Sequence, residues 1–505
     1  GRDKRFAEFL GADRFRGFEL ARVPLFRLTL LRYGGAEFRL IWTFHHTVLE
    51  GRSYRLVLEE VFAFYEALRR GEEAIPPPPP RPYRDYIAWL QQQDFSKDEA
   101  FWRETLKGFT TPTPLVVDHA PDTRHDSRPG HGTQELLLPA QITSALRALA
   151  RDNQLTLNTI VQGAWALLLS RYSGEADVVF GVIRGNRRST IEGADAMIGL
   201  FLNTLPLRVR VNPEAALLPW LHEVRRQWMA MRGHEHTPLA KVQGWSEVPG
   251  GTALFQSTMM FENYDLATML RKQGGAWSNR RFRLFLQTNY PLGLAAYDGA
   301  ELRLRIDFDR ARIDDAAGGR MLGHMRTLLE AIAIHPQQKL GELPLLNSAE
   351  RHQLLVEWNQ TAAGYPENLC LHDAFEAQVD RTPDAVAVTF EEQHLTYREL
   401  NQRSNRLAHH LCKLGVGPDV LVGICAERSP EMVVGLLGVL KAGGAYVPID
   451  PSYPAERVAF MLHDASASVM LAQQNLIQTL PALKATKVVS LDEREWATSA
   501  GNTGN

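Results

Sequence analysis

The sequence predicts an α/β protein in two parts, a larger part with two lobes and a smaller part that begins a parallel sheet. Three observations lead to this prediction. Segments with strand and helix patterns are mixed along residues 1–345, and a polar, proline-rich stretch at 110–132 divides them. Strands and helices alternate after residue 371. The 505-residue chain is also too long for one compact core.

The first lobe, expected over residues 1–130, opens with a hairpin. Residues 26–31 and 37–44 are predicted strands around a Gly-Gly turn. A helix is expected over 53–68, because enough apolar residues recur there to give a buried side. The proline run at 76–80 cannot lie inside a helix or a central strand, so it is expected to be a stiff surface connector, followed by a helical region over 83–106.

The second lobe, expected over residues 131–345, mixes both element types. The segment 157–172 is apolar nearly all round and is therefore expected to be a buried helix. The other expected helices cover 139–153, 217–231 and 320–333, and the expected strands cover 134–138, 178–182, 255–261, 292–296 and 302–308. The segment 199–211 is expected to be a loop followed by a strand.

The last helix of the second lobe is expected to end at His335-Pro336. Residues 346–367 are expected to be a linker. A new domain is expected over 368–505. Its predicted helices cover 372–381, 397–414 and 430–442, and its predicted strands cover 385–390, 421–425 and 446–448.

Composition excludes several classes of protein. The net charge of −2 gives no reason to expect nucleic acid or an anionic membrane as a partner. No apolar run reaches the ~18 residues that a membrane span needs. Cys370, Cys412 and Cys425 form no C-x-x-C pattern, which disfavours disulfides and structural zinc and favours a reducing, cytoplasmic setting. The start lacks an initiator Met and a signal peptide, and we expect the chain to be a fragment.

The stretch 45–51, His-His-Thr-Val-Leu-Glu-Gly, directly follows a predicted strand and is the main candidate for chemistry. A metal site of His45, His46 and Glu50 is disfavoured, because alternating strand side chains would point the two histidines apart. No G-x-S-x-G motif or nearby nucleophilic cysteine indicates covalent catalysis. Two interpretations remain open: His46 contacts an attacking group, or the histidines are buried and satisfied by the backbone.

Several motifs together resemble the nonribosomal peptide synthetase family. Residues 45–51 are similar to HHxxxDG of its condensation domain. Further matches are 83–89 to YxDYAxW, 198–206 to (I/V)GxFxNTxP, 234–239 to an HQxxPF-type segment and 254–256 to PLFQ. In the second part, 395–400 matches LTYxEL and 440–450 matches LKAGxAYVPID of the amino-acid adenylation domain. Their order follows the family over nearly the whole chain.

The resemblance implies a fold and a reaction. Residues 1–345 would form the two lobes of a chloramphenicol-acetyltransferase-like condensation domain, and 368–505 the first part of an α/β adenylate-forming domain. The domain would join the α-amine of an acceptor aminoacyl group to a donor acyl or peptidyl thioester. His46 matches the motif histidine placed beside the attacking amine, and it would deprotonate or orient that amine.

The resemblance also implies supporting residues: His45, Glu50, Gly51, Arg187 and Asn203. The motif acid would pair with Arg187 of the second lobe. Glu50 stands where the family has Asp, and one extra methylene moves the carboxylate by ~1.5 Å. A shift of that size is enough to misplace a catalytic loop and lower activity. The local sequence Gly185-Asn186-Arg187 also differs from the Ser-Gly-Arg that is usual in the family.

The implied partners are upstream and downstream carrier domains, which bear both substrates on phosphopantetheine, and the remaining synthetase domains. The early SxxQxRLW-like motif, the ATP loop and a carrier serine motif are missing from the sequence. We therefore expect this fragment to bind no cofactor and its adenylation part to be inactive. ATP and Mg²⁺ would be needed only by a complete adenylation domain. The alternatives are a non-catalytic scaffold domain, an epimerisation domain and a stand-alone acyltransferase.

Overall fold

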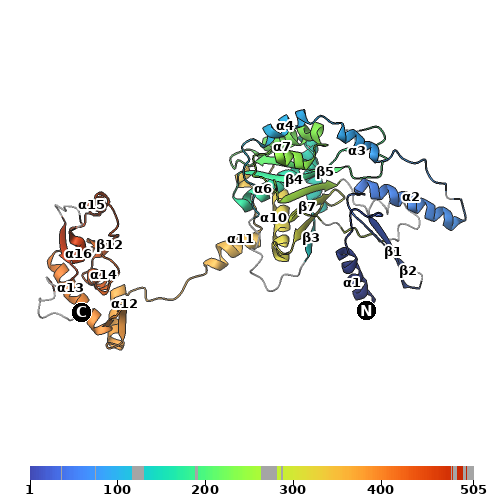
Figure 1. Ribbon diagram of the computed structural model, residues 1–505. Helices are drawn as coiled ribbons and strands as arrows, with labels where there is room; N and C mark the ends of the chain where they lie inside the picture. The colour runs from blue at the N-terminus through green and yellow to red at the C-terminus, as the bar shows by residue number, and fades with distance from the viewer. Residues whose placement is uncertain are drawn as a thin grey trace. The chain divides into compact units, whose positions relative to one another are not determined.

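The chain forms two compact units, residues 1–360 and 361–505 (Figure 1). The computed structural model describes residues 1–35, 37–73, 75–115, 130–187, 191–262, 281–285, 288–478, 480, 486–492 and 496. Most of the polar stretch expected as a loop at 110–132 lies outside these described residues. No helix in the described part of the chain is long and apolar enough to cross a membrane.

The segment expected to form the first lobe contains the predicted hairpin and helix. Strands β1 (Phe26–Gly34) and β2 (Glu37–Phe44) pair antiparallel, and α2 (Gly51–Arg70) follows. A further helix, α1 (Arg2–Phe15), precedes them. Figure 1 shows these elements in blue at one side of the first unit.

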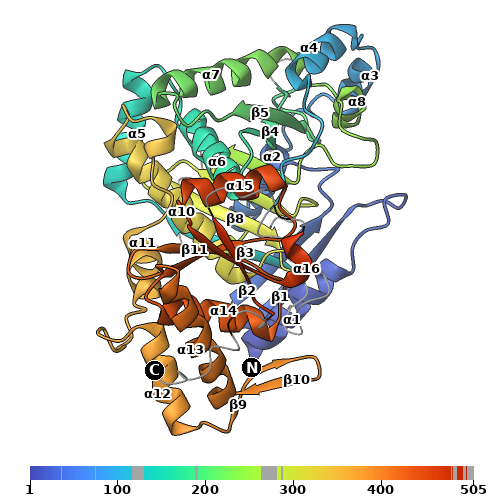
Figure 2. The same cartoon turned by 90° about the vertical axis from the view of Figure 1, so that its left-hand side faces the viewer.

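The helical region expected over 83–106 is two helices, α3 (Arg84–Gln91) and α4 (Ser96–Leu106). The break has a local cause, because the Asp94 carboxylate accepts hydrogen bonds from the backbone N–H of Ser96 at 2.9 Å and from its hydroxyl. Such side-chain bonds compete with helix continuation. Figure 2 shows α3 and α4 near α8 (Leu239–Trp245), a short helix that the sequence pattern did not predict.

A six-stranded mixed sheet organises residues 131–309, which lie in the segment expected as the second lobe, in the order β3-β8-β7-β6-β4-β5. The central pairs β4–β6 and β6–β7 are parallel and the others are antiparallel. The strands are β3 (His131–Leu137), β4 (Asp177–Gly185), β5 (Leu202–Arg210), β6 (Ser257–Glu262), β7 (Leu292–Tyr297) and β8 (Arg303–Asp309).

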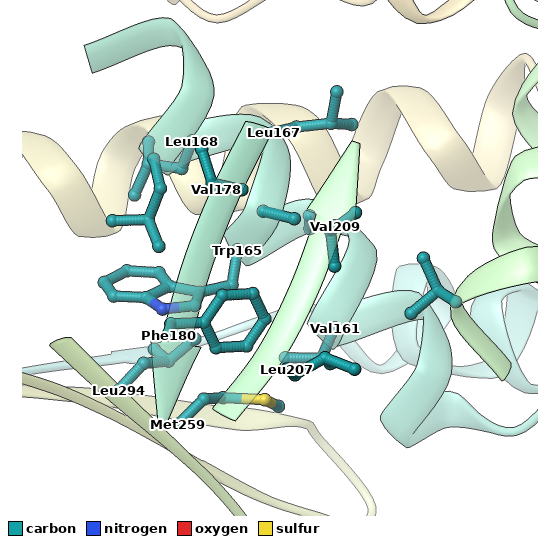
Figure 3. Packing of buried hydrophobic residues seen from close by; sticks show 14 of the residues in the cluster. Val161, Trp165, Leu167, Leu168, Val178, Phe180, Leu207, Val209, Met259 and Leu294 are labelled. Carbon is teal, nitrogen blue, oxygen red and sulfur yellow. The ribbon is translucent and has the colours of Figure 1, made fainter. Parts of the chain in front are cut away.

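Helices pack against this sheet and bury its core. The helix α6 (Leu157–Ser173) lies against β4 and β6, and most of its residues from Leu157 to Leu169 are buried, as its all-round apolar pattern predicts. Figure 3 shows its Trp165 beside Phe180 of β4 and near Met259 of β6. The other helices are α5 (Ala140–Asp152), α7 (Leu217–Ala230) and α10 (Asp315–Ile334).

Helix caps account for two of the differences from the sequence prediction. Helix α10 begins five residues before the expected 320, where the Asp314 carboxylate accepts the N–H of Ala317. Residues 348–355, expected in the linker, form α11 (Ser348–Leu355), which starts at a capping box between Asn347 and Glu350. The Glu350 carboxylate also lies 3.2 Å from His324 of α10.

The second unit contains a parallel sheet in the order β12-β11-β13-β14. Strand β9 (Val386–Phe390) is separate from it and pairs antiparallel with β10 (Gln393–Thr396). The parallel strands are β11 (Leu421–Cys425), β12 (Ala445–Ile449), β13 (Val469–Ala472) and β14 (Lys487–Ser490), and the helices are α12 (Leu371–Arg381), α13 (Tyr397–Lys413), α14 (Pro430–Lys441), α15 (Ala455–Asp464) and α16 (Gln474–Ile477).

Candidate functional site

His46 lies in a turn that joins β2 to α2. The backbone N–H of His45 donates to the carbonyl of Leu25 at 2.9 Å, and the N–H of Val48 donates to the carbonyl of His45 at 3.2 Å. These bonds fix the turn, while the His46 side chain is exposed. No described residue makes a hydrogen bond to its imidazole. His46 therefore lies in a turn that its neighbours hold in place, and its ring nitrogens are available to a substrate.

His45 has a different environment. Its Nδ1 lies 2.9 Å from the Thr47 hydroxyl and accepts the Thr47 N–H at 3.2 Å, and its ring meets Phe18 edge to face. These contacts shape the turn. Both histidines follow the last residue of β2, so strand alternation does not decide their directions. Among the described residues, ligand atoms of three possible metal ligands gather only at Cys370, His372 and Asp373, in the second unit.

Glu50 and Arg187 form a buried ion pair between the two segments that are expected to form the lobes. Nε of Arg187 donates to the Glu50 carboxylate at 2.5 Å, and Arg187 and Glu50 are 7% and 3% exposed. Glu50 is the N-cap residue of α2, and Arg187 follows β4. The extra methylene of Glu50 therefore does not prevent the contact that the resemblance implied for Asp.

The rest of the Arg187 guanidinium is bound as well. Nη1 donates to the carbonyls of Ala194 and Met197 at 2.7 and 2.8 Å, and Nη2 donates to the Ser53 hydroxyl at 2.7 Å. The guanidinium also lies over the Phe201 ring, 4.2 Å from its centroid. A guanidinium satisfied in this way fixes the geometry of every group around it.

Ser53 is a site residue that the sequence analysis missed. It is fully buried in the first turn of α2, and its hydroxyl donates to the Gly199 carbonyl at 2.6 Å and accepts the Gly199 N–H at 2.9 Å. A serine near the start of a helix is common, and its sequence context does not predict a hydrogen-bond partner 146 residues away. Ser53 and Glu50 together bind the beginning of α2 to the second lobe.

Gly51 and Gly199 differ in what the structure requires of them. A Cβ at Gly51 would only touch the Tyr54 hydroxyl at 3.8 Å, so packing does not explain the glycine. A Cβ at Gly199 would lie 2.0 Å from the Tyr83 ring. Tyr83 packs on Phe201 and donates to the Leu200 carbonyl at 2.6 Å. Two of the motif segments, 83–89 and 198–206, therefore meet at Gly199.

Asn203 lies on β5 and anchors a neighbouring loop. Its side-chain amide donates to the carbonyls of Glu235 and Thr237 at 2.9 and 2.7 Å. The Glu235 carboxylate accepts Nε of Arg184 at 2.8 Å. The contacts place Asn203 in a supporting position, separate from the Glu50–Arg187 pair.

The same loop is held from α4 by a buried acid. The Asp98 carboxylate accepts the Thr237 hydroxyl at 2.8 Å and lies 2.8 Å from Nδ1 of His234. His234 in turn stacks on Phe101 with ring centroids 4.1 Å apart. This loop therefore has fixed contacts on both sides.

Burial sets the protonation of the groups around this junction. It raises the pKa of Glu50, and the charge of Arg187 opposes that rise. Burial also raises the pKa of Tyr83 to about 12, which keeps its hydroxyl a neutral hydrogen-bond donor. The charge of His46 also acts to lower the pKa of Glu50.

Comparison with known proteins assigns both units. A family model described as Condensation domain matches residues 2–355, and one described as AMP-binding enzyme matches 375–504. A linear gramicidin synthase from Brevibacillus parabrevis is 46% identical over 486 residues, which cover 96% of this chain and 10% of that protein. Chondramide synthase of Chondromyces crocatus is 41% identical over 95% of this chain and 13% of its own length. The chain thus spans about a tenth of these relatives.

Solved structures show the same fold. A four-domain nonribosomal peptide synthetase bound to AMP and glycine aligns with a TM-score of 0.72 and 19% identity, over 97% of this chain and 38% of that chain. The starter condensation domain of rhizomide synthetase aligns with a TM-score of 0.54 and 21% identity, over 68% of this chain and 78% of that one.

Proposed function

Because the chain belongs to the nonribosomal peptide synthetases, with a condensation domain and part of an AMP-binding domain, we propose that its first unit forms peptide bonds. The α-amine of an aminoacyl group on one carrier domain attacks the thioester of an acyl or peptidyl group on another. Phosphopantetheine arms carry both substrates. The observation that carries this proposal is the exposed His46 on a turn whose neighbours are tied to the second lobe.

In this proposal His46 contacts the attacking amine. Its ring has no described hydrogen-bond partner, so a nitrogen can accept a proton from the amine or orient its lone pair. Glu50, Ser53 and Arg187 hold the start of α2, and His45 and Thr47 shape the turn. Orientation of two tethered substrates supplies a large part of the rate in such a reaction.

The intact Glu50–Arg187 pair supports a catalytic domain over a scaffold, because the altered motif acid still reaches its arginine. We further propose carrier domains and neighbouring synthetase domains as partners. ATP and Mg²⁺ are required only where the adenylation domain is complete. A reducing, cytoplasmic setting is proposed on the three unpaired cysteines.

The test is condensation between two loaded carrier proteins on the complete module that contains this chain. We expect dipeptide from the wild type and from His222→Ala, whose exposed histidine lies on α7, and none from His46→Ala. Equal product from wild type and His46→Ala would overturn the assignment of His46. Carrier binding without product in the wild type would favour a scaffold, and deuterium uptake at the donor α-carbon in D₂O would favour epimerisation.

A further inference from the structure

Asn186 is a buried polar residue that the proposed reaction has not used. It lies between the end of β4 and Arg187, and it is 1% exposed. Its backbone N–H donates to the carbonyl of Phe201 at 3.0 Å, and its side-chain amide donates to the hydroxyl of Tyr86 at 3.0 Å. Asn186 therefore joins helix α3 to the segment 198–206 from the position directly before Arg187.

The two partners of Asn186 pack on one another and on Arg187. The ring centroids of Tyr86 and Phe201 are 4.5 Å apart. The Arg187 guanidinium lies 4.2 Å from the centroid of the Phe201 ring. These four residues form a closed set of contacts, so the surface on which the guanidinium rests depends on where Asn186 holds the Tyr86 ring.

This set of contacts reaches the His46 turn through Arg187. The guanidinium binds the Glu50 carboxylate through Nε and the Ser53 hydroxyl through Nη2. Glu50 is the N-cap residue of α2, and the turn that carries His46 leads directly into it. A continuous series of contacts therefore runs from Asn186 to the residue at which the turn ends.

Packing alone does not explain a buried amide at this position. Its Oδ1 has no hydrogen-bond partner in the part of the chain that the structure describes. A buried acceptor without a partner is costly. A residue without an amide would avoid this cost but would also lose the bond to Tyr86. The bond is present despite the unpaired acceptor, which points to a role for Asn186 in fixing Tyr86.

We infer that Asn186 is a positioning residue for the formation of the peptide bond. It fixes the hydroxyl of Tyr86, the Tyr86 and Phe201 rings support the Arg187 guanidinium, and Arg187 holds the start of α2 and with it the His46 turn. This inference rests on the proposed function and adds a residue that acts through others. Its loss disturbs the orientation of the attacking amine and leaves carrier binding unchanged, so it lowers kcat and does not change KM.

The test combines single-turnover and steady-state condensation in the complete module, with the donor on a separate carrier protein. Asn186→Gly removes the amide. Tyr86→Phe removes only the hydroxyl and retains the ring that packs on Phe201. We expect each variant to lower the single-turnover rate about 10-fold, with KM for the donor carrier within about 2-fold of wild type. The double variant should be no slower than the slower single variant, because both changes break the same bond.

Two changes of the same kind elsewhere in the unit serve as controls. Tyr172→Phe removes a hydroxyl that lies 2.7 Å from Nδ1 of His324, and Asn153→Gly removes an amide that donates to the Leu149 carbonyl at 2.9 Å. Both lose one side-chain hydrogen bond away from the junction, and we expect both to condense at the wild-type rate. An equal loss of rate in the controls would assign the effect to stability and overturn the inference.

A second arm tests the route through Arg187. Arg187→Lys keeps the charge but lacks the planar fork that lies over Phe201 and bonds to Ser53, so it should already be slow. In this background Asn186→Gly should lower the rate by less than about 2-fold more, because the group through which it acts is gone. A loss of about 10-fold in both backgrounds would show that Asn186 does not act through Arg187 and would overturn the inference.

The outcomes separate this inference from the proposed function. Unfolding curves identify any variant that is not folded, and if Asn186→Gly is one of these, Tyr86→Phe decides. Wild-type rates for the folded variants, with His46→Ala inactive, would overturn the role of Asn186 and leave the proposed function standing. A raised KM with an unchanged single-turnover rate would assign Asn186 to carrier binding and also overturn its positioning role. Absence of product from the wild type would overturn both.

Discussion

The Glu50 carboxylate and the Arg187 guanidinium meet at 2.5 Å, although 137 residues separate them in the sequence. The pair joins the N-cap of α2 to the segment that follows β4. Both side chains are almost fully buried. The pair therefore helps to hold the start of α2, and with it the His46 turn, against the segment after β4. Removal of either partner would leave the other as an uncompensated buried charge.

Removal of Arg187 should destabilise the first unit strongly. Arg187→Ala leaves Glu50 buried without its cation, and loss of one partner of a buried pair costs about 3–5 kcal/mol. Denaturant unfolding measures this change. Arg210→Ala is the control, because Arg210 is exposed and lies 3.6 Å from Asp177, and such surface pairs contribute about 0–1 kcal/mol. Equal losses in both variants would contradict the buried-pair interpretation.

The family residue at position 50 should be tolerated. Glu50→Asp shortens the side chain by about 1.5 Å but keeps the charge, so dipeptide formation should stay at or above the wild-type rate. Glu50→Gln removes the charge and should lower both stability and rate. The carrier-based condensation assay measures both variants. A rate for Glu50→Asp far below that of Glu50→Gln would show that side-chain length matters more than charge.

An alanine at Gly199 should disturb the junction of Tyr83, Phe201 and Ser53. Its Cβ would lie 2.0 Å from the Tyr83 ring, and overpacking of this kind typically costs about 1–3 kcal/mol. We expect a lower unfolding midpoint and slower condensation. Gly319→Ala, on the exposed side of α10 with no atom near its Cβ, should instead stabilise by up to about 1 kcal/mol. A neutral Gly199→Ala would contradict the packing described for this glycine.

Glu262 should make stability depend on pH in a defined direction. Its folded-state pKa of about 7 is above the ordinary 4.5, so the folded state holds this proton more tightly. The resulting stabilisation is complete below the ordinary pKa and is lost as pH rises through about 7, to a limit of about 3 kcal/mol. Residual exposure of the side chain reduces this limit.

Glu262→Gln removes that proton site. The variant should therefore gain stability relative to wild type as the pH is raised from about 5 to about 8. Denaturant unfolding of both proteins at the two pH values measures the difference. A difference that does not change with pH would show that Glu262 titrates at its ordinary value in the folded protein.

The sequence by itself determined which residues belong to the motifs and most of the elements that carry them. The hairpin of residues 26–44, helix α2 and the buried helix α6 follow from patterns within each segment, because periodicity and turn residues are local properties. The resemblance to the condensation and adenylation domains also came from short motifs and their order.

Tertiary structure alone decided which distant groups meet. Ser53 gives no local signal for its bonds to Arg187 and Gly199. The antiparallel pairing of β9 with β10, outside the parallel sheet, was likewise not visible in the strand pattern. These cases share one physical cause. Strand pairing and buried polar contacts are fixed by packing between segments that are far apart in sequence. A local pattern shows only which face of each segment is apolar.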